Sequence, residues 1–167
     1  MKKTGVFYGS STGTTEDIAG RIAAKLGIGS SDIVNVAYAD ASSLSNYEAL
    51  ILGSSTWGAG DLQDDWEGFI SALEGADLSG KTVAIFGTGD GSSFGDTFCD
   101  AIGTIYQAAK KAGADVVGAV STDGYSYDDS TALVDGQFVG LPIDEVNEDD
   151  QTDSRIAAWV EQIKSAL

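Results

Sequence analysis

Short runs of apolar residues recur along the chain, and most of them are continuous instead of alternating with polar positions. Five are found, at residues 5–8, 33–36, 49–53, 83–87 and 116–120. Continuous runs of this length are typical of strands that are buried on both faces of a sheet. The pattern therefore predicts a central sheet of five strands.

The segments between these runs carry apolar residues at helical spacing. The clearest one, from Ile18 to Leu26, follows the hydroxyl and acidic side chains of residues 14–17, which are typical of a helix start with a hydroxyl N-cap. Further helices are expected at residues 66–73, 98–109 and 156–167. This alternation of strands and helices predicts an α/β fold, with a parallel sheet covered by helices on both faces.

The rhythm changes after the fifth run. Residues 121–137 are polar, rich in Gly, Asp, Ser and Tyr, and have no helical period, and a second strand-like piece follows at residues 138–141. We interpret this as an insertion that splits the last strand, with Pro142 closing the second piece. A plain surface loop and a contact with a partner are both open roles for the insertion. No repeat or linker divides the chain, so residues 1–167 are expected to form a single domain.

Charge and residue usage remove several classes of function. The 167 residues hold 26 Asp and Glu against 9 Lys and Arg, a formal net charge of −17, with no His and a single Cys. Nucleic acids and anionic membrane surfaces are therefore not expected as partners. Histidine-based triads and zinc sites, iron–sulfur clusters, metal sites in general and internal disulfides are not expected either. The chemistry must come from a cofactor or from carboxylates.

The first residues of the chain and the length of its apolar runs suggest where the protein is located in the cell. Two lysines follow Met1, but the next residues are too polar for the apolar core of a signal peptide. No apolar run approaches the about 18–20 residues of a membrane-spanning helix. A cytoplasmic protein is expected.

Residues 9–15, after the first strand, form a loop with hydroxyl side chains around Gly13 at a helix start. Backbone N–H groups and the helix dipole make such a turn an anion site, and the hydroxyls can complete the shell around a phosphate. The loop carries no Lys or Arg and fits neither a P-loop nor a G-x-G-x-x-G pattern. Two interpretations are open: a site for one phosphate monoester held by neutral donors, and a well-capped helix start without a ligand.

Two further loops follow the third and fourth strands, where ligands bind in open parallel sheets. Residues 54–61 place Trp57 among small residues, and residues 87–96 place Phe94 among glycines, acids and hydroxyls. Two rings from two loops could enclose a flat heteroaromatic group. The alternative is that Trp57 folds back into the core, as Trp66 and Trp159 are expected to do.

These motifs together resemble the flavodoxins, specifically the long-chain kind with an interrupted last strand. Residues 10–15 look like the family's phosphate loop for flavin mononucleotide (FMN), and residues 56–58 and 87–96 fit the loops that cover the two flavin faces. Residues 138–145 and 155–160 are similar to the family's C-terminal third. The resemblance implies a flavodoxin-like, doubly wound, five-stranded parallel sheet in the order 2-1-3-4-5.

The resemblance also implies a cofactor and its contacts. Phe94 stands where a Tyr is usual, Gly91 where a polar side chain is common, and Val146 where several relatives carry an acid. FMN is expected to be bound noncovalently. The residues expected to bind it are Ser10, Ser11, Thr12, Gly13, Thr14, Thr15, Ser55, Thr56, Trp57, Gly58, Ala59, Thr88, Gly89, Asp90, Phe94, Asp96, Phe98, Cys99 and Asp144.

The implied activity is that of a low-potential one-electron carrier cycling between flavin semiquinone and hydroquinone. Rotation of the Gly58–Ala59 peptide could present the Gly58 carbonyl to the reduced ring, and a base-free acidic rim would lower the second potential. The chain is then not an enzyme, and has no catalytic residues of its own. It would be a monomer that serves redox proteins with basic docking surfaces, such as reductases of the flavodoxin/ferredoxin–NADP type and ferredoxin-accepting enzymes.

Three other functions stay open at the level of sequence. An FMN-dependent NAD(P)H quinone or nitro reductase is the main alternative, and a flavin-free phosphate-binding module is a second. A receiver-type signalling domain is disfavoured because Gly9 and Ser54 follow the first and third strands where acids are needed. The lone Cys99, expected on the first turn of a helix, is interpreted as a small buried apolar residue.

Overall fold

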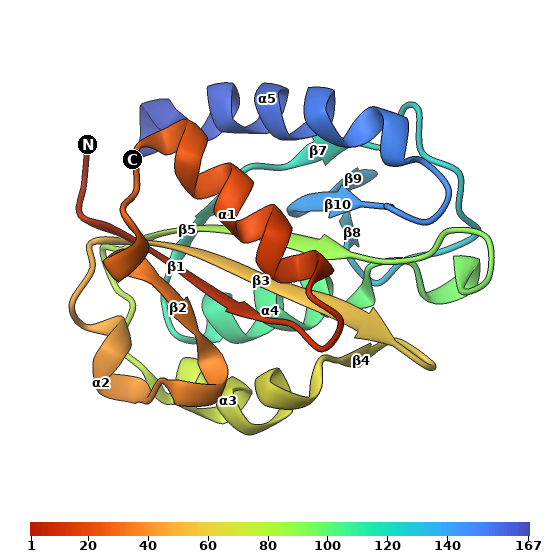
Figure 1. The fold of residues 1–167 in the computed structure, drawn as a ribbon. Helices are drawn as coiled ribbons and strands as arrows, with labels where there is room; N and C mark the ends of the chain where they lie inside the picture. The colour runs from red at the N-terminus through yellow and green to blue at the C-terminus, as the bar shows by residue number, and fades with distance from the viewer.

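The computed structural model describes all residues, 1–167, and is built on one parallel sheet (Figure 1). Its strands run in the order β2-β1-β3-β5-β10, and each neighbouring pair is parallel. This confirms the predicted order 2-1-3-4-5. These five strands are β1 (Thr4–Gly9), β2 (Ile33–Asn35), β3 (Ala49–Trp57), β5 (Thr82–Thr88) and β10 (Leu141–Ile143). A further strand, β6 (Asp115–Val117), pairs in parallel with the first half of β5.

Helices cover both faces of this sheet, as predicted. Figure 1 shows α1 and α5 on one side and α2, α3 and α4 on the other. The helices are α1 (Thr14–Leu26), α2 (Ala41–Leu44), α3 (Asp64–Gly75), α4 (Asp100–Lys111) and α5 (Thr152–Ile163), with 3₁₀ turns at Ser30–Asp32, Val36–Tyr38, Gly95–Thr97, Asp149–Gln151 and Lys164–Ala166. None of the helices has the length and apolar character needed to cross a bilayer.

Two apolar layers hold the helices to the sheet. Every residue from Ala49 to Ser55 in β3 is buried, with alternate side chains facing opposite layers. Trp66 of α3 is fully buried in one layer, and Trp159 of α5 is 1% exposed in the other. Both tryptophans are therefore core residues, as the sequence predicted.

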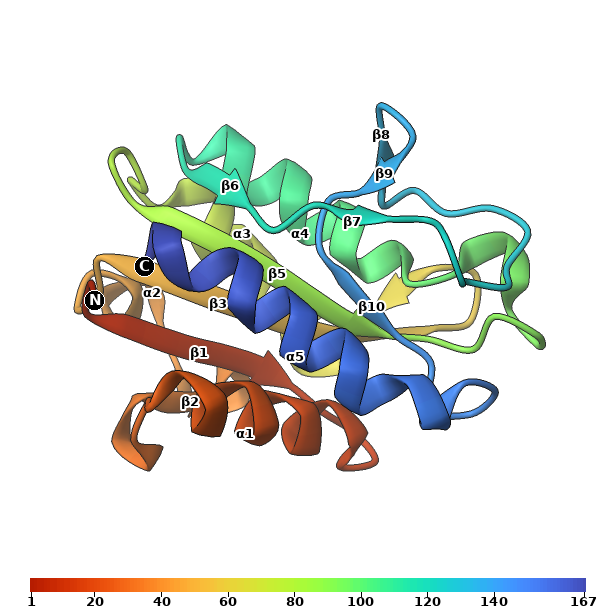
Figure 2. The same cartoon turned by 90° about the horizontal axis from the view of Figure 1, so that it is seen from above.

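The last strand is split, which confirms the predicted insertion, but the break comes earlier than expected. β6 ends at Val117 because Gly118 adopts a positive φ of 92° and its carbonyl accepts the indole N–H of Trp159 (2.9 Å). The chain then forms a three-stranded antiparallel sheet before β10 takes up the same edge of β5 (Figure 2). Its strands are β7 (Val120–Ser121), β8 (Leu133–Val134) and β9 (Gln137–Phe138).

Pro142 does not close the second piece, as we expected, but lies inside β10. The strand tolerates it because β10 is at the edge of the sheet and pairs only with β5. A proline lacks the N–H that a second neighbour would need, so an edge is where it fits.

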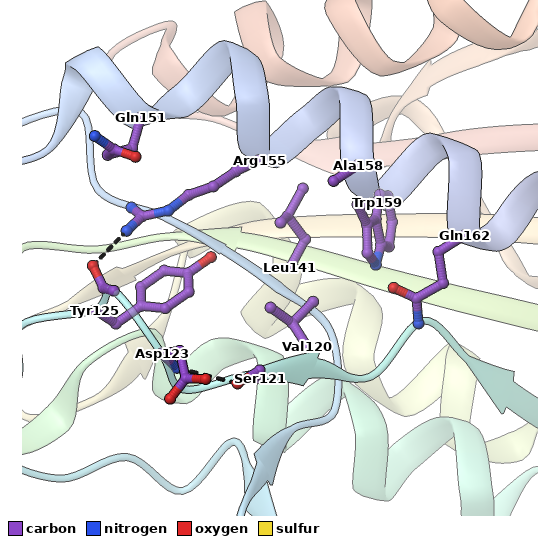
Figure 3. Close-up of a pocket in the computed structure, with 11 residues that line it drawn as sticks. Val120, Ser121, Asp123, Tyr125, Leu141, Gln151, Arg155, Ala158, Trp159 and Gln162 are labelled. Carbon is purple, nitrogen blue, oxygen red and sulfur yellow. Dashed lines mark hydrogen bonds between the residues drawn. The ribbon is translucent and has the colours of Figure 1, made fainter.

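Side chains of α5 fasten the insertion to the body of the protein. Arg155 donates to the carbonyl of Gly124 (2.8 Å), and its guanidinium lies 3.8 Å from the ring centre of Tyr125. Gln162 donates to the carbonyl of Ala119 (2.9 Å). A cavity of about 280 Å³ lies between these attachments, with Trp159 and Leu141 among its lining residues (Figure 3).

Candidate functional site

A cleft of about 300 Å³ opens at the carboxyl ends of β1, β3 and β5. The ends of β1 and β3 point to the right in Figure 1. In a doubly wound sheet this is the edge where ligands bind, because the strand order reverses there. The cleft is lined by Thr12, Thr14, Ser55, Thr56, Trp57, Thr88, Gly89, Asp90, Phe94, Glu145 and Val146. The three loops singled out in the sequence therefore meet around one cleft.

Other candidate residues do not line the cleft. Gly13 and Thr15 belong to the start of α1, and Gly58 and Ala59 to the turn after β3. The whole set outside the lining is Ser10, Ser11, Gly13, Thr15, Gly58, Ala59, Asp96, Phe98, Cys99 and Asp144. The lining residues Glu145 and Val146 were not among the candidates.

The loop of residues 9–15, here called the phosphate-type loop, ends in a helix start that no side chain caps. Gly13, the N-cap residue of α1, has a φ of 94°, and the hydroxyl N-cap that we expected is absent. The first intrahelical bond runs from the N–H of Asp17 to the carbonyl of Gly13 (3.0 Å). The N–H groups of Thr14, Thr15 and Glu16 precede that bond. These N–H groups have no acceptor within the helix, and they lie at the positive end of the helix dipole.

Two threonines join this helix start to the central sheet. Thr15 is 1% exposed, and its hydroxyl lies 3.1 Å from that of Thr88, at the end of β5. Thr88 in turn lines the cleft. This contact therefore fixes the start of α1 against the end of β5, the strand that leads into the loop of Phe94.

The wall that carries Trp57 is more regular than the sequence indicated. Residues 54–57, expected as a loop, continue β3, which folds back as a hairpin on β4 (Asp61–Leu62). The indole N–H of Trp57 donates to the hydroxyl of Ser55 (2.8 Å), and the residue is 43% exposed. Trp57 is therefore fixed at the cleft and does not fold back into the core.

The hairpin turn is built on a glycine with an unusual backbone. Gly58 has a φ of 51°, and the N–H of Gly60 donates to the carbonyl of Trp57 (3.1 Å) across the turn. No backbone N–H donates to the carbonyl of Gly58. Because glycine adopts positive and negative φ at similar cost, the Gly58–Ala59 peptide can rotate without breaking the turn's own hydrogen bond.

The opposite wall carries Phe94, which is 48% exposed. Its loop is organised by Asp90, which accepts the N–H groups of Ser92 (3.0 Å) and Ser93 (2.9 Å) and the side-chain amide of Asn147 (2.8 Å). The N–H of Ser93 and the amide of Asn147 lower the pKa of Asp90. Asp90 therefore keeps its negative charge at the cleft at neutral pH.

The insertion explains the glycine at position 91. A Cβ atom on Gly91 would lie 2.2 Å from the carbonyl oxygen of Ser126, so any larger residue would force the two segments apart. The carbonyl of Gly95 accepts the N–H groups of Asp128 (2.8 Å) and Asp129 (2.9 Å). The insertion thus buttresses the loop that carries Phe94.

Asp144 acts behind the cleft. It is 1% exposed, and its carboxylate accepts the N–H groups of Gly91 (3.0 Å), Val146 (3.1 Å) and Asn147 (2.9 Å). It thereby joins the loop after β5 to the loop after β10. Its carboxylate also accepts the side-chain amide of Asn147 (3.0 Å), so all of its hydrogen bonds are with these two loops.

Phe98 and Cys99 lie in the core, and Asp96 is exposed outside the cleft. Phe98 stacks on Tyr127 of the insertion, with ring centres 5.5 Å apart. Cys99 is not on the first turn of α4, as we expected, but is its N-cap with a φ of 51°, because the helix begins at Asp100. Burial raises the pKa of the Cys99 thiol, which fits its interpretation as a small buried apolar residue.

The cleft carries negative charge and no lysine or arginine. Its ionisable lining residues are Asp90 and Glu145. The nearby Arg21 is engaged by Glu145 (3.5 Å) and by Asp153 and Asp17. An anionic group would thus be held here by N–H and hydroxyl donors at the helix start.

The sequence also carries a signal for the lining residues Glu145 and Val146. Both follow β10, so they lie at the same carboxyl edge as the three loops that were considered. Once the split strand is counted as one, the rule that ligands bind at this edge includes the loop after β10.

Asp100 links the Trp57 turn to the insertion. It is 7% exposed, accepts the N–H of Thr131 (2.8 Å), and has an oxygen 2.6 Å from where a Cβ on Gly60 would lie. Burial raises the pKa of Asp100. A raised pKa means that its contribution to stability is fully present below the unfolded-state pKa of about 3.9 and is lost as pH rises through the folded-state value.

We therefore expect Asp100→Asn to raise the melting temperature at pH 7 and to have little effect below about pH 3.9, where the acid is protonated. The asparagine oxygen can still accept from Thr131, so the contact survives. Thermal unfolding followed by circular dichroism across this pH range measures both effects. Asp64→Asn is the control, because Asp64 is the exposed first residue of α3. Equal shifts in both variants would contradict a specific effect of burial.

Fold and cleft together define a doubly wound α/β protein with an uncapped helix start and two exposed aromatic residues at one cleft. A family model described as Flavodoxin matches residues 6–159. Flavodoxin of Nostoc sp. is 47% identical over 164 residues, covering 98% of this chain and 96% of the relative. Flavodoxin of Helicobacter pylori is 44% identical over 167 residues, covering 100% and 99%.

Solved structures agree with the sequence relatives. The crystal structure of Fusobacterium nucleatum flavodoxin bound to flavin mononucleotide superposes with a TM-score of 0.92 and 36% identity, covering 100% of this chain and 99% of that one. The chain belongs to the flavodoxin family. The resemblance inferred from the sequence is thereby confirmed.

Proposed function

We propose that this chain is a low-potential one-electron carrier that binds FMN noncovalently in the cleft. The observation that carries the proposal is the meeting of an uncapped helix start with two exposed aromatic side chains, Trp57 and Phe94, at one cleft. A flat ring system bearing a single phosphate has the two features that these walls and donors match. The Fusobacterium nucleatum relative, which was solved with FMN, supports the same ligand.

Bound FMN supplies a centre that can accept and release electrons one at a time. The protein's part is to orient it and to exclude substrates from its faces. Trp57 and Phe94 would cover the faces, and Ser55 holds the Trp57 indole in place through its 2.8 Å hydrogen bond. The carbonyl of Gly58, which accepts no backbone hydrogen bond, would be free to accept a hydrogen bond from an N–H group of the bound ring. Rotation about this glycine makes that contact reversible.

The negatively charged lining of the cleft is expected to lower the reduction potential of bound FMN. Asp90 and Glu145 face the cleft and no lysine or arginine does, so a further negative charge there is disfavoured. For a one-electron couple, about 1.4 kcal/mol of such repulsion lowers the potential by about 59 mV. The lining would therefore make a redox group bound here a stronger electron donor.

We further propose that the chain acts as a single-domain monomer whose acidic surface docks on basic surfaces of its redox partners. Its formal net charge of −17 supports association with positively charged sites on ferredoxin–NADP-type reductases and on ferredoxin-accepting enzymes. Such encounters are steered by long-range attraction and are weakened by salt.

The test separates a carrier from a reductase. The FMN-loaded protein is mixed with NADPH and a quinone, first alone and then with a ferredoxin–NADP-type reductase. We expect no NADPH oxidation in the first case, and electron transfer that slows as ionic strength rises in the second. Turnover of NADPH without the added reductase would contradict the proposal and favour an FMN-dependent quinone or nitro reductase.

A further inference from the structure

Gln63 connects α3 to the phosphate-type loop from behind. It is the N-cap residue of α3 and is 2% exposed. Its side-chain amide nitrogen donates to the hydroxyl of Ser11 (3.1 Å) and to the carboxylate of Asp65 (2.8 Å). Its amide oxygen accepts the backbone N–H of Asp65 (3.0 Å). Both ends of this buried amide are therefore used.

These contacts fix the direction of the hydrogen bond to Ser11. A backbone N–H can only donate, so the amide oxygen of Gln63 must face Asp65 and the amide nitrogen must face Ser11. Ser11 then accepts from Gln63. A hydroxyl has one proton to donate, and here that proton is left for a different acceptor. The side chain of Ser11 is exposed, so this acceptor can come from outside the protein.

Gln63 also sets the backbone at the beginning of the same loop. A Cβ atom on Gly9 would lie 2.2 Å from the amide oxygen of Gln63 and 2.7 Å from Trp66, so the loop leaves β1 in direct contact with both side chains. The backbone N–H of Gln63 donates to the hydroxyl of Ser54 (3.2 Å), which is fully buried near the end of β3. Through Gln63, the loop is thus held in place relative to β1, β3 and α3.

We propose that Gln63 is a positioning residue for the phosphate group: it holds the loop of residues 9–13 in place and presets Ser11 as a hydrogen-bond donor to the ligand's phosphate oxygens. The proposal rests on the proposed binding of FMN. It assigns a role to a buried residue outside the cleft lining, acting through Ser11 and the backbone of the loop. A hydroxyl that already accepts a hydrogen bond is a better donor, because such bonds strengthen one another in series.

The test compares ligands that differ only in the phosphate. Gln63→Met keeps a side chain of similar length but removes the amide. Dissociation constants are measured for FMN, riboflavin and inorganic phosphate with the flavin-free protein. We expect the affinity for FMN to fall about tenfold, as for loss of one hydrogen bond to a charged group, while riboflavin affinity stays within about twofold. Phosphate affinity should fall in parallel with that for FMN.

A double-variant cycle tests the route through Ser11. Ser11→Ala should weaken FMN binding by a similar factor, and the double variant should lose no more than the stronger of the two single variants. Gln151→Met is the matched control, because Gln151 is the N-cap of α5, is exposed and makes no capping hydrogen bond. It should leave all three affinities unchanged.

Two results would overturn the role of Gln63: unchanged FMN affinity in Gln63→Met, or an equal loss for FMN and riboflavin, which would mean a general disturbance of the cleft. Failure of the proposed function is distinguishable from both. In that case the unaltered protein would bind no FMN, whereas the phosphate titrations of the parent and Gln63→Met would still decide whether Gln63 positions the loop.

Discussion

Replacing Thr14 with Asp is expected to abolish tight binding of FMN while leaving the binding of riboflavin nearly unchanged. Thr14 is the first residue of α1 and lines the cleft, next to the N–H groups that precede the first intrahelical bond. A carboxylate there would compete for these donors and repel the phosphate, which carries about −1.5 to −2 charge. A like-charge contact costs several kcal/mol, so the affinity for FMN should fall at least about a hundredfold.

The same substitution should stabilise the flavin-free protein. An acid in the first turn of a helix interacts favourably with its dipole, by about 0.3–1 kcal/mol. Calorimetric titration and denaturant unfolding measure the two effects on one sample. Thr14→Asn serves as the uncharged control and should lose far less affinity. If Thr14→Asp lowered the affinities for FMN and riboflavin alike, the helix start would not be the phosphate site.

Trp66→Ala is expected to have the largest effect on stability, about 3–5 kcal/mol in the free energy of unfolding. The indole is fully buried between α3 and the sheet and packs edge-on against Phe69, with ring centres 5.5 Å apart. Its N–H donates to the carbonyl of Gly53 (2.7 Å), which would lose this partner in the interior. The variant therefore loses both packing and a buried hydrogen bond.

Trp57→Ala provides the matched comparison, because the same side chain is removed from a site that is 43% exposed. We expect it to cost less than about 1 kcal/mol in stability but to weaken flavin binding, since it removes one wall of the cleft. Urea unfolding of the flavin-free proteins measures the stabilities. Equal costs for the two variants would contradict the assignment of Trp66 to the core and Trp57 to the site.

Much of the fold could be predicted because its signals are local. The runs at residues 49–53 and 83–87 are continuous since their strands are buried by helices on both faces. The period of α1 is equally plain, because only one of its faces is buried. Such patterns depend on neighbours in sequence, so a single chain reveals them.

The deviations arise from contacts between distant segments. β3 extends to Trp57 because it pairs with β4. Residues 54–57 have no sequence pattern that predicts a strand. The chain leaves β6 at Gly118 because Trp159, far along the sequence, takes up its carbonyl. The start of α1 also differs from expectation, because Thr14 lines the cleft and the Thr15 hydroxyl contacts Thr88, so neither caps the helix.

The candidate site shows the same division. Trp57, Phe94 and the threonines of the first loop stand out because large or polar side chains follow buried strands. Gln63 and Asp100 give no such signal, since a lone polar residue in a helix start is ordinary until its partners are known. The roles of Gln63 and Asp100 are therefore visible only in the structure, whereas most residues that line the cleft could be found from the sequence.

Stepwise anaerobic reduction of the FMN-loaded protein, followed by its visible spectrum, tests the proposed one-electron function most directly. We expect a yellow protein that passes through a blue one-electron-reduced stage and then bleaches at a distinctly lower potential, because the cleft lined by Asp90 and Glu145 resists the second electron's charge. A protein that bleaches directly in one two-electron step would contradict a one-electron carrier. A protein that stays colourless after addition of FMN would contradict the flavin site itself.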